Sequence, residues 1–156
     1  MNTGTPTSPA TPGTLTYGVL VPVDVYFDDL DSFGMLHNSH YGVLAERAWV
    51  TYWQKREIPF SKDWVMLDDG FNVAKELRIV YETPIDRPGA YGVHFWVDRL
   101  GRTSMTYGFR VCAPDGSGTY AQGIRTVIRL DRTTLRPAEW SEPARALSTS
   151  LLRPEQ

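Results

Sequence analysis

Cysteine is nearly absent from this 156-residue sequence, since Cys112 is the only one. A single thiol cannot form an internal disulfide or supply a cysteine-based metal cluster. The chain also has no run of about 18 apolar residues, which a membrane-spanning helix would need, and no apolar signal core near its N-terminus. These absences favour a cytoplasmic protein with no membrane-spanning segment.

Charge of one sign is also lacking, because 16 Lys and Arg oppose 18 Asp and Glu and leave a net charge of −2. Domains that bind nucleic acid usually carry a basic stripe or patch, which this mixed pattern does not provide. The length fits one domain that can bury a single core, and the sequence contains no internal repeats. We therefore expect one domain that does not bind nucleic acid.

The first part of the chain has few residues that could face a core. Residues 1–14 consist mainly of Thr, Pro, Gly and Ser, a composition that predicts a disordered tail. The ordered domain is expected over residues 15–135. A C-terminal extension over residues 136–156 is expected to form a loop and a weak helical turn.

What is present is a clear change of hydrophobic period along the chain. Apolar residues alternate over residues 19–27, which is typical of a half-buried strand, and Pro22 suggests an edge or a bulge. Over residues 41–52 they fall at i, i+3, i+4, i+7 and i+11, which predicts a helix. Asn38 or Ser39 is the expected N-cap of that helix.

The period of two then returns for most of the remaining chain. After a loop over residues 62–70, it marks four further strands, over residues 71–82, 91–97, 105–111 and 120–130. Pro and Gly between these strands favour hairpins at residues 84–89, 100–102 and 114–116, and hence a meander. The whole pattern predicts an α+β domain, in which one helix covers one face of an antiparallel sheet.

The segment between the first strand and the helix concentrates polar chemistry. Residues 29–41 read DLDSFGMLHNSHY, with two Asp, two His, one Asn and one Gly. This stretch is either a polar surface loop that caps the helix or an active site. Taken alone, Asp31 is more simply explained as a residue that caps a turn, and Asp29 as a solvated or turn-bonding acid.

Four positions of this segment match a family signature. Asp31, Gly34, Asn38 and Tyr41 follow the order Asp-x-x-Gly-x-x-x-Asn-x-x-Tyr at the start of the helix. With the order of strands and helix, this resembles the hotdog-fold acyl-CoA thioesterases of the 4-hydroxybenzoyl-CoA thioesterase-like group. The resemblance covers residues 17–131, which is nearly all of the expected domain.

Three shorter stretches resemble the same family. They are an acidic-x-Ala stretch at residues 46–48, a Tyr-x-x-Pro exit from a strand within residues 80–85, and a Gly-x-Ser type of turn at residues 101–104. Two positions depart from the family pattern. Met35 stands where many members carry His, and His37 stands where many carry Asn.

The resemblance implies a hotdog fold, in which an antiparallel five-stranded sheet wraps around one long central helix. It also implies hydrolysis of an acyl thioester, carried by CoA or by an acyl-carrier protein, without a metal or other cofactor. A carboxylate can act as base or nucleophile on the thioester, and helix N-terminal amides can stabilise the oxyanion. The resemblance assigns these roles to Asp31 and to the amide near Asn38.

Other candidate residues have plainer alternatives. The candidates for substrate binding beside Asn38 are Gly34, His37, Tyr41 and Glu46, and those for CoA binding are Arg99, Arg102 and Ser104. Glu46 could instead form a surface ion pair, and exposed arginines are usually only solvated. His37 and His40 could line a pocket or lie on the surface, and no second cluster of metal ligands accompanies them.

The expected fold leaves sheet edges and one flank of the helix uncovered, and such edges need covering. Hotdog proteins pair two sheets side by side and build each active site between subunits. The resemblance therefore implies a homodimer, or a homotetramer built as a dimer of dimers. Trp49, Trp53 and Trp96 could supply the apolar surface.

Two other functions remain open at this point. A hydratase or dehydratase of the same fold would use His37 or His40 as its base, and would hydrate an enoyl-CoA. A non-catalytic acyl-CoA-binding or regulatory protein would bind the thioester without cleaving it. The carboxylate of Asp31 counts against that second reading, because an inert binder needs no such group.

Overall fold

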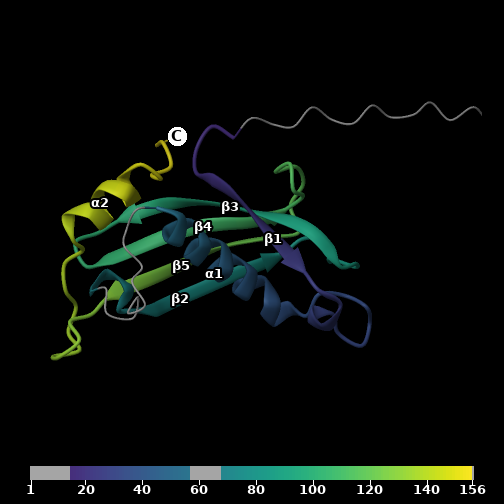
Figure 1. Ribbon diagram of the computed structural model, residues 1–156, viewed down its shortest axis with the longest axis horizontal. Coiled ribbons are helices and arrows are strands. Elements are labelled where there is room, and N and C mark those ends of the chain that lie inside the picture. The colour runs from purple at the N-terminus through teal and green to yellow at the C-terminus, as the bar shows by residue number, and fades with distance from the viewer. Residues whose placement is uncertain (1–14, 57–67, 156) are drawn as a thin grey trace, which may run out of the picture.

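A computed structural model describes residues 15–56 and 68–155 of the chain (Figure 1). The helices and strands are β1 (Val19–Val25), α1 (Asn38–Lys55), β2 (Asn72–Tyr81), β3 (Gly89–Leu100), β4 (Ser104–Cys112), β5 (Ala121–Arg129) and α2 (Glu142–Thr149). The expected tail over residues 1–14 lies outside the described residues, as does most of the loop expected over 62–70. None of the described helices is long and apolar enough to cross a membrane.

The five strands form one antiparallel sheet in the order β1-β3-β4-β5-β2, and α1 lies across one face of it (Figure 1). The predicted α+β class and the predicted long helix are confirmed. The apolar face of α1 is buried at the predicted positions, which are Tyr41, Leu44, Ala45, Ala48 and Tyr52. Pro22 lies in β1, which is an edge strand, as the sequence suggested.

The predicted hairpin at residues 84–89 is wrong, and so is the meander that depended on it. β2 pairs with β5, and β3 lies between β1 and β4. The connection between β2 and β3 instead crosses the end of the sheet beneath the start of α1, where Ile85 is fully buried. There the Leu36 N–H donates to the Ile85 carbonyl over 2.8 Å. The period of two identifies a strand's buried face but does not identify its neighbours.

Two predicted boundaries also shift. β1 ends at Val25, and residues 27–29 form a 3-10 turn that leaves Phe27 exposed. The N-cap of α1 is His37, not Asn38 or Ser39, because the His37 Nδ1 accepts a hydrogen bond from the Ser39 N–H over 3.2 Å. An imidazole nitrogen thus takes the place of the side-chain oxygen that usually caps a helix.

A bulge divides β2 and changes which of its side chains face α1. The register with β5 shifts between Ala74 and Glu76, so one extra residue enters the strand. Ala74 and Leu77 consequently border the same groove beneath α1. Leu77 and Ile79 share one face as the sequence predicts, whereas Val73, which was expected beside them, lies on the other face.

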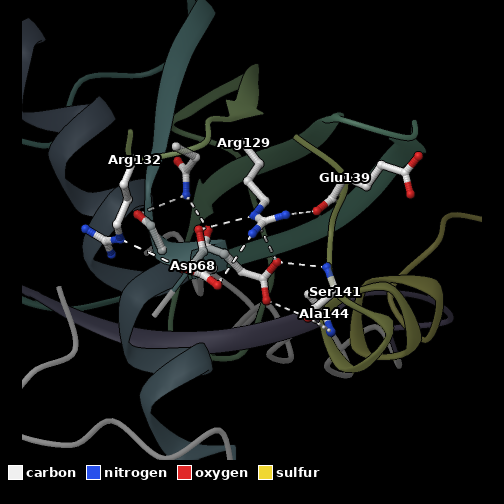
Figure 2. Close-up of polar contacts among 9 residues, drawn as sticks. Asp68, Arg129, Arg132, Glu139, Ser141 and Ala144 are labelled. Atoms are coloured by element: carbon white, nitrogen blue, oxygen red, sulfur yellow. Dashed lines mark hydrogen bonds and ion pairs between the residues drawn. The ribbon is translucent and has the colours of Figure 1, made fainter. Parts of the chain in front are cut away.

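The C-terminal segment forms a capped helix rather than the weak turn expected. Ser141 caps α2, and the Asp69 carboxylate accepts hydrogen bonds from the Ser141 N–H and hydroxyl over 2.9 and 2.5 Å. Figure 2 shows the surrounding network, in which Arg129 at the end of β5 donates to the Glu139 carbonyl. Trp140 is buried in the same core as the residues beneath α1. These contacts fix α2 against the end of the sheet.

Trp96 does not supply the exposed apolar surface that the sequence suggested. It lies on the opposite face of the sheet from α1 and is only 8% exposed, beneath the Tyr17 and Arg153 side chains. Its Nε1 donates to the Asp98 carboxylate over 2.7 Å. Trp49 and Trp53 are half-buried and pack against the core beneath α1.

Candidate active site

The Asp31 carboxylate uses one of its two oxygens to hold the loop before α1. Its Oδ1 accepts hydrogen bonds from the Phe33 and Met35 N–H groups over 2.8 and 3.2 Å. Gly34 completes the turn with a φ of +77°, which a side chain would disfavour. Within the described residues, Oδ2 has no hydrogen-bond partner. Asp31 is therefore a turn-capping residue that still has one oxygen available to a ligand.

The first turn of α1 offers a free backbone donor. The Ser39 N–H donates to the His37 side chain, and the His40 N–H donates to the His37 carbonyl over 2.9 Å. In the described parts of the chain, no hydrogen bond joins the Asn38 N–H to an acceptor. A free amide at the positive end of a helix favours a negatively charged ligand atom.

Asp31 and Asn38 border one cavity of about 420 Å³. Its walls are Asp31, Met35, Leu36, His37, Asn38 and Tyr41 on one side and Tyr81, Glu82, Thr83 and Pro84 on the other. Four predicted site residues, Asp31, His37, Asn38 and Tyr41, thus come together. The residues of the second wall are not among the predicted site residues, although Tyr81 and Pro84 belong to the Tyr-x-x-Pro stretch that resembles the family pattern.

Two tyrosines hold the cavity walls together. The Tyr81 hydroxyl donates to the Asn38 carbonyl over 3.2 Å, and the Tyr41 hydroxyl accepts from the Ile85 N–H over 3.1 Å. The two rings meet edge to face at 5.3 Å. Burial raises the pKa of the Tyr41 hydroxyl, although the Ile85 N–H acts in the opposite direction. This hydroxyl therefore stays neutral and able to accept near neutral pH.

Asp29 is buried rather than solvated. It is 8% exposed, its Oδ2 accepts from the Tyr26 N–H over 2.8 Å, and its Oδ1 lies 3.1 Å from the His40 Nδ1. His40 does not border the 420 Å³ cavity. The Asp29–His40 pair therefore anchors the loop to α1, which agrees with the turn-bonding role considered for Asp29.

Glu46 lies outside this cavity, on a second and smaller groove of about 200 Å³ between α1 and β2. The groove residues are Ser39, Gly42, Val43, Ala45, Glu46, Ala74, Leu77, Phe109 and Arg125. The Glu46 carboxylate forms an ion pair with Arg125 over 3.3 Å. Of the two roles that the sequence leaves open for Glu46, a surface ion pair and a position near the substrate, the structure shows the ion pair.

The three candidates for CoA binding lie at the far end of the sheet. The turn between β3 and β4 contacts α2, since the Arg145 side chain donates to the Gly101 carbonyl over 3.0 Å. Arg102 pairs there with Glu139 over 3.0 Å, while Arg99 is exposed and Ser104 begins β4. The loop that carries Asp31 lies at the opposite end (Figure 1). A single chain does not bring these residues to the Asp31 cavity.

Among the described residues, no group of three His, Cys, Asp or Glu side chains is arranged to hold a metal ion.

Comparison with known proteins agrees with this geometry. Residues 25–147 match the model of the thioesterase-like superfamily. A thioesterase from Thermus thermophilus, whose structure is complexed with coenzyme A and Zn, is 30% identical over 89% of this chain and 98% of its own, with a TM-score of 0.71. The chain therefore belongs to the thioesterase-like superfamily and has the hotdog fold that the sequence resemblance implied.

More distant structures share the fold alone. A protein from Pseudomonas aeruginosa strain PAO1 is 20% identical over 90% of this chain and 95% of its own, with a TM-score of 0.75. The DHNA-CoA thioesterase from Staphylococcus aureus is 18% identical over 84% of this chain and 87% of its own, with a TM-score of 0.68. No curated protein sequence matches the chain.

Proposed function

We propose that this protein hydrolyses acyl-CoA thioesters, with Asp31 as the catalytic carboxylate and the Asn38 N–H as the oxyanion donor. The observation that carries the proposal is that Asp31 and Asn38 border one cavity, and that the Asp31 Oδ2 and the Asn38 N–H have no hydrogen-bond partner among the described residues. Membership of the thioesterase-like superfamily supports the reaction class. The coenzyme A bound to the Thermus thermophilus relative supports CoA, rather than a carrier protein, as the thiol carrier.

The reaction needs negative charge to be stabilised where the thioester carbonyl oxygen lies. When an oxygen nucleophile adds to the carbonyl carbon, this oxygen becomes an oxyanion, which the Asn38 N–H and the helix dipole stabilise. The carbon–sulfur bond then breaks and releases the CoA thiolate, which takes up a proton. The Tyr81 hydroxyl helps to position the Asn38 N–H group, because it donates a hydrogen bond to the Asn38 carbonyl.

Asp31 can provide the oxygen nucleophile in two ways. As a base, its Oδ2 takes a proton from water, and the resulting hydroxide adds to the acyl carbon. As a nucleophile, Oδ2 itself adds, the thiolate leaves, and water hydrolyses the resulting anhydride. A single turnover in H₂¹⁸O that places label in Asp31 identifies the nucleophile route, because water that hydrolyses the anhydride at the aspartyl carbon leaves its oxygen there, whereas direct attack by water on the thioester labels only the released acid.

Asp31→Asn tests the catalytic assignment. The asparagine amide oxygen can still accept from the Phe33 and Met35 N–H groups, so the turn is retained while the charge is lost. We expect kcat for the best acyl-CoA to fall by about 10²–10⁴, as for loss of a catalytic base. The release of free thiol measures turnover, and a melting curve checks the fold.

Asp28→Asn is the matched control, since Asp28 is exposed in the same segment and does not border the cavity. It should leave kcat unchanged. A kcat for Asp31→Asn within threefold of the wild-type value, with a normal melting curve, would show that Asp31 is only a turn cap. Hydration of an enoyl-CoA without thiol release would instead support the hydratase alternative.

We also propose that the active protein is a homodimer joined along β2. This strand is an edge of the sheet. The backbone N–H and C=O groups on its outer side have no neighbouring strand within the described chain. Four of its apolar side chains are between 46% and 53% exposed, namely Val73, Leu77, Val80 and Tyr81. An exposed apolar edge is a template for pairing with another copy. The cavity and the groove both border β2, so a second copy would help to enclose them.

A further inference from the structure

Arg125 is a partly buried cation whose hydrogen-bonding capacity is mostly unused. Its side chain is 21% exposed and lies on β5, at the floor of the groove between α1 and β2. Only its Nη1 has partners among the described residues, the Glu46 carboxylate at 3.3 Å and the Tyr107 hydroxyl at 3.4 Å. Close arginine–carboxylate contacts are about 2.7–2.9 Å, so both contacts are loose. The planar fork therefore remains available to a stronger acceptor.

The groove begins one residue along α1 from the cavity that contains Asp31. Asn38 borders the cavity and the next residue, Ser39, borders the groove. Along α1 the groove then extends from Ser39 to Glu46, which is about 10 Å at the rise of an α-helix. An acyl group whose carbonyl lies at the Asn38 amide can therefore extend between α1 and β2 toward Arg125.

The side chains that line the groove are mostly apolar, and Arg125 adds a positive charge among them. Val43, Leu77 and Phe109 provide apolar walls suited to methylene groups. Glu46 is 54% exposed at its side chain, so it can turn into water at little cost when another carboxylate takes its place. A carboxylate can then bind Arg125 through two parallel N–H···O bonds.

We propose that Arg125 selects acyl thioesters whose acyl chain ends in a carboxylate, that is, monothioesters of dicarboxylic acids. This inference rests on the proposed thioesterase function and names its substrate class. An acyl chain with a methyl terminus would leave the guanidinium without a good partner and would place apolar carbon against a charge, which is unfavourable.

Adipoyl-CoA and hexanoyl-CoA form a matched pair of substrates, since they differ only in the terminal carboxylate of a six-carbon acyl chain. We expect the wild-type kcat/KM to be about tenfold to a hundredfold higher for adipoyl-CoA, the range for charge-assisted hydrogen bonds. Arg125→Met keeps an unbranched, flexible side chain of the size of the Arg125 aliphatic stem and removes the charge and the donors. It should abolish the preference mainly by lowering kcat/KM for adipoyl-CoA.

Three further variants separate selectivity from structure. Arg125→Lys keeps the charge but not the fork, and should retain part of the preference. Glu46→Gln should increase the preference, because it removes a competing carboxylate. Arg136→Met removes an exposed arginine in the turn after β5 that does not border the groove, and should leave the preference unchanged.

Several results would overturn the inference. Equal kcat/KM values of the wild-type enzyme for hexanoyl-CoA and adipoyl-CoA would overturn it, even if Arg125→Met fails to fold. An equal loss of kcat/KM on both substrates in a folded Arg125→Met variant would also overturn it. If neither thioester is hydrolysed, the proposed function fails instead, and calorimetric Kd values then test the groove. Tighter binding of adipoyl-CoA that Arg125→Met removes would support the groove assignment, and equal Kd values would reject it.

Discussion

At the scale of single residues, three side chains that border the Asp31 cavity also hold the local structure through one polar atom each. Asp31 holds its turn through Oδ1, His37 caps α1 through Nδ1, and Tyr81 donates to a helix carbonyl. A catalytic group held in this way loses little conformational freedom when substrate arrives. The hydrogen bonds that stabilise the loop therefore also orient its candidate catalytic groups.

The bond between Tyr41 and Ile85 gives a stability prediction. Tyr41→Phe removes the acceptor of a buried N–H group, which costs about 1–3 kcal/mol when no other acceptor replaces it. Urea unfolding should show this loss of free energy with an unchanged m-value.

Tyr81→Phe is the matched control for that measurement, because the Tyr81 side chain is half exposed and water can replace its bond to the Asn38 carbonyl. It should cost less than about 1 kcal/mol, the usual net worth of one hydrogen bond. It should instead lower kcat, since the oxyanion donor loses its support. An equal loss of stability in both variants would contradict the difference in burial.

The residue types of the site could be predicted from the sequence, but their division of tasks could not. The resemblance of Asp31, Asn38 and Tyr41 to the family signature predicted that they belong to one site, and all three border the cavity. The contribution of Tyr81 depended on β2 passing beside the first turn of α1, which no local pattern encodes. Arg125 was not singled out, because its environment is formed by α1, β4 and β5 together.

At the scale of elements, α1 approaches β2 closely at Gly42. A Cβ at this position would lie 3.4 Å from the Leu77 Cδ2 and 3.6 Å from the Ile79 Cδ1, which is ordinary van der Waals contact. Glycine in a helix interior costs about 0.5–1 kcal/mol relative to alanine. Gly42→Ala should therefore raise the free energy of unfolding by about that amount.

The same substitution should narrow the groove, because Gly42 is one of its walls. Relative to the wild-type protein, we expect the variant's KM to increase for long acyl-CoAs but not for acetyl-CoA, while its melting temperature rises. A variant that is more stable and has an unchanged KM for every chain length would place the acyl group elsewhere.

Element positions followed from hydrophobic period, whereas strand neighbours did not. All five strands and α1 were found near their predicted positions because each shows its hydrophobic period in the sequence, although β2 has no buried residue. The residues after β2 looked like a hairpin because Pro84 and Pro88 are typical of turns, yet Ile85 within them is fully buried. Burial of that side chain beneath α1 outweighs local turn preference and directs the chain across the sheet.

At the scale of the whole molecule, the exposed edge of β2 gives a prediction about assembly. The wild-type protein should sediment at least as a dimer at micromolar concentration. Val80→Lys places a charge on this edge, as natural sheets do to prevent pairing, and should shift the protein toward monomer. Turnover should fall with the loss of the dimer.

Leu135→Lys is the control, because Leu135 is a similarly exposed apolar residue located in the turn after β5. It should leave sedimentation and turnover unchanged. A folded, fully active wild-type monomer would contradict the proposal that a second copy helps to enclose the site.

The crossing connection between β2 and β3 also makes the cavity a late product of folding. The bonds that close it are distant in sequence, since Tyr41 and Ile85 are 44 residues apart and Asn38 and Tyr81 are 43 apart. Contacts of this kind form only after the entropy of loop closure has been overcome, which slows folding. A chain that has formed only α1 and the β3–β4–β5 hairpins has no cavity. Recovery of turnover during refolding would therefore follow the docking of β2 and not the earlier return of helix and hairpin structure.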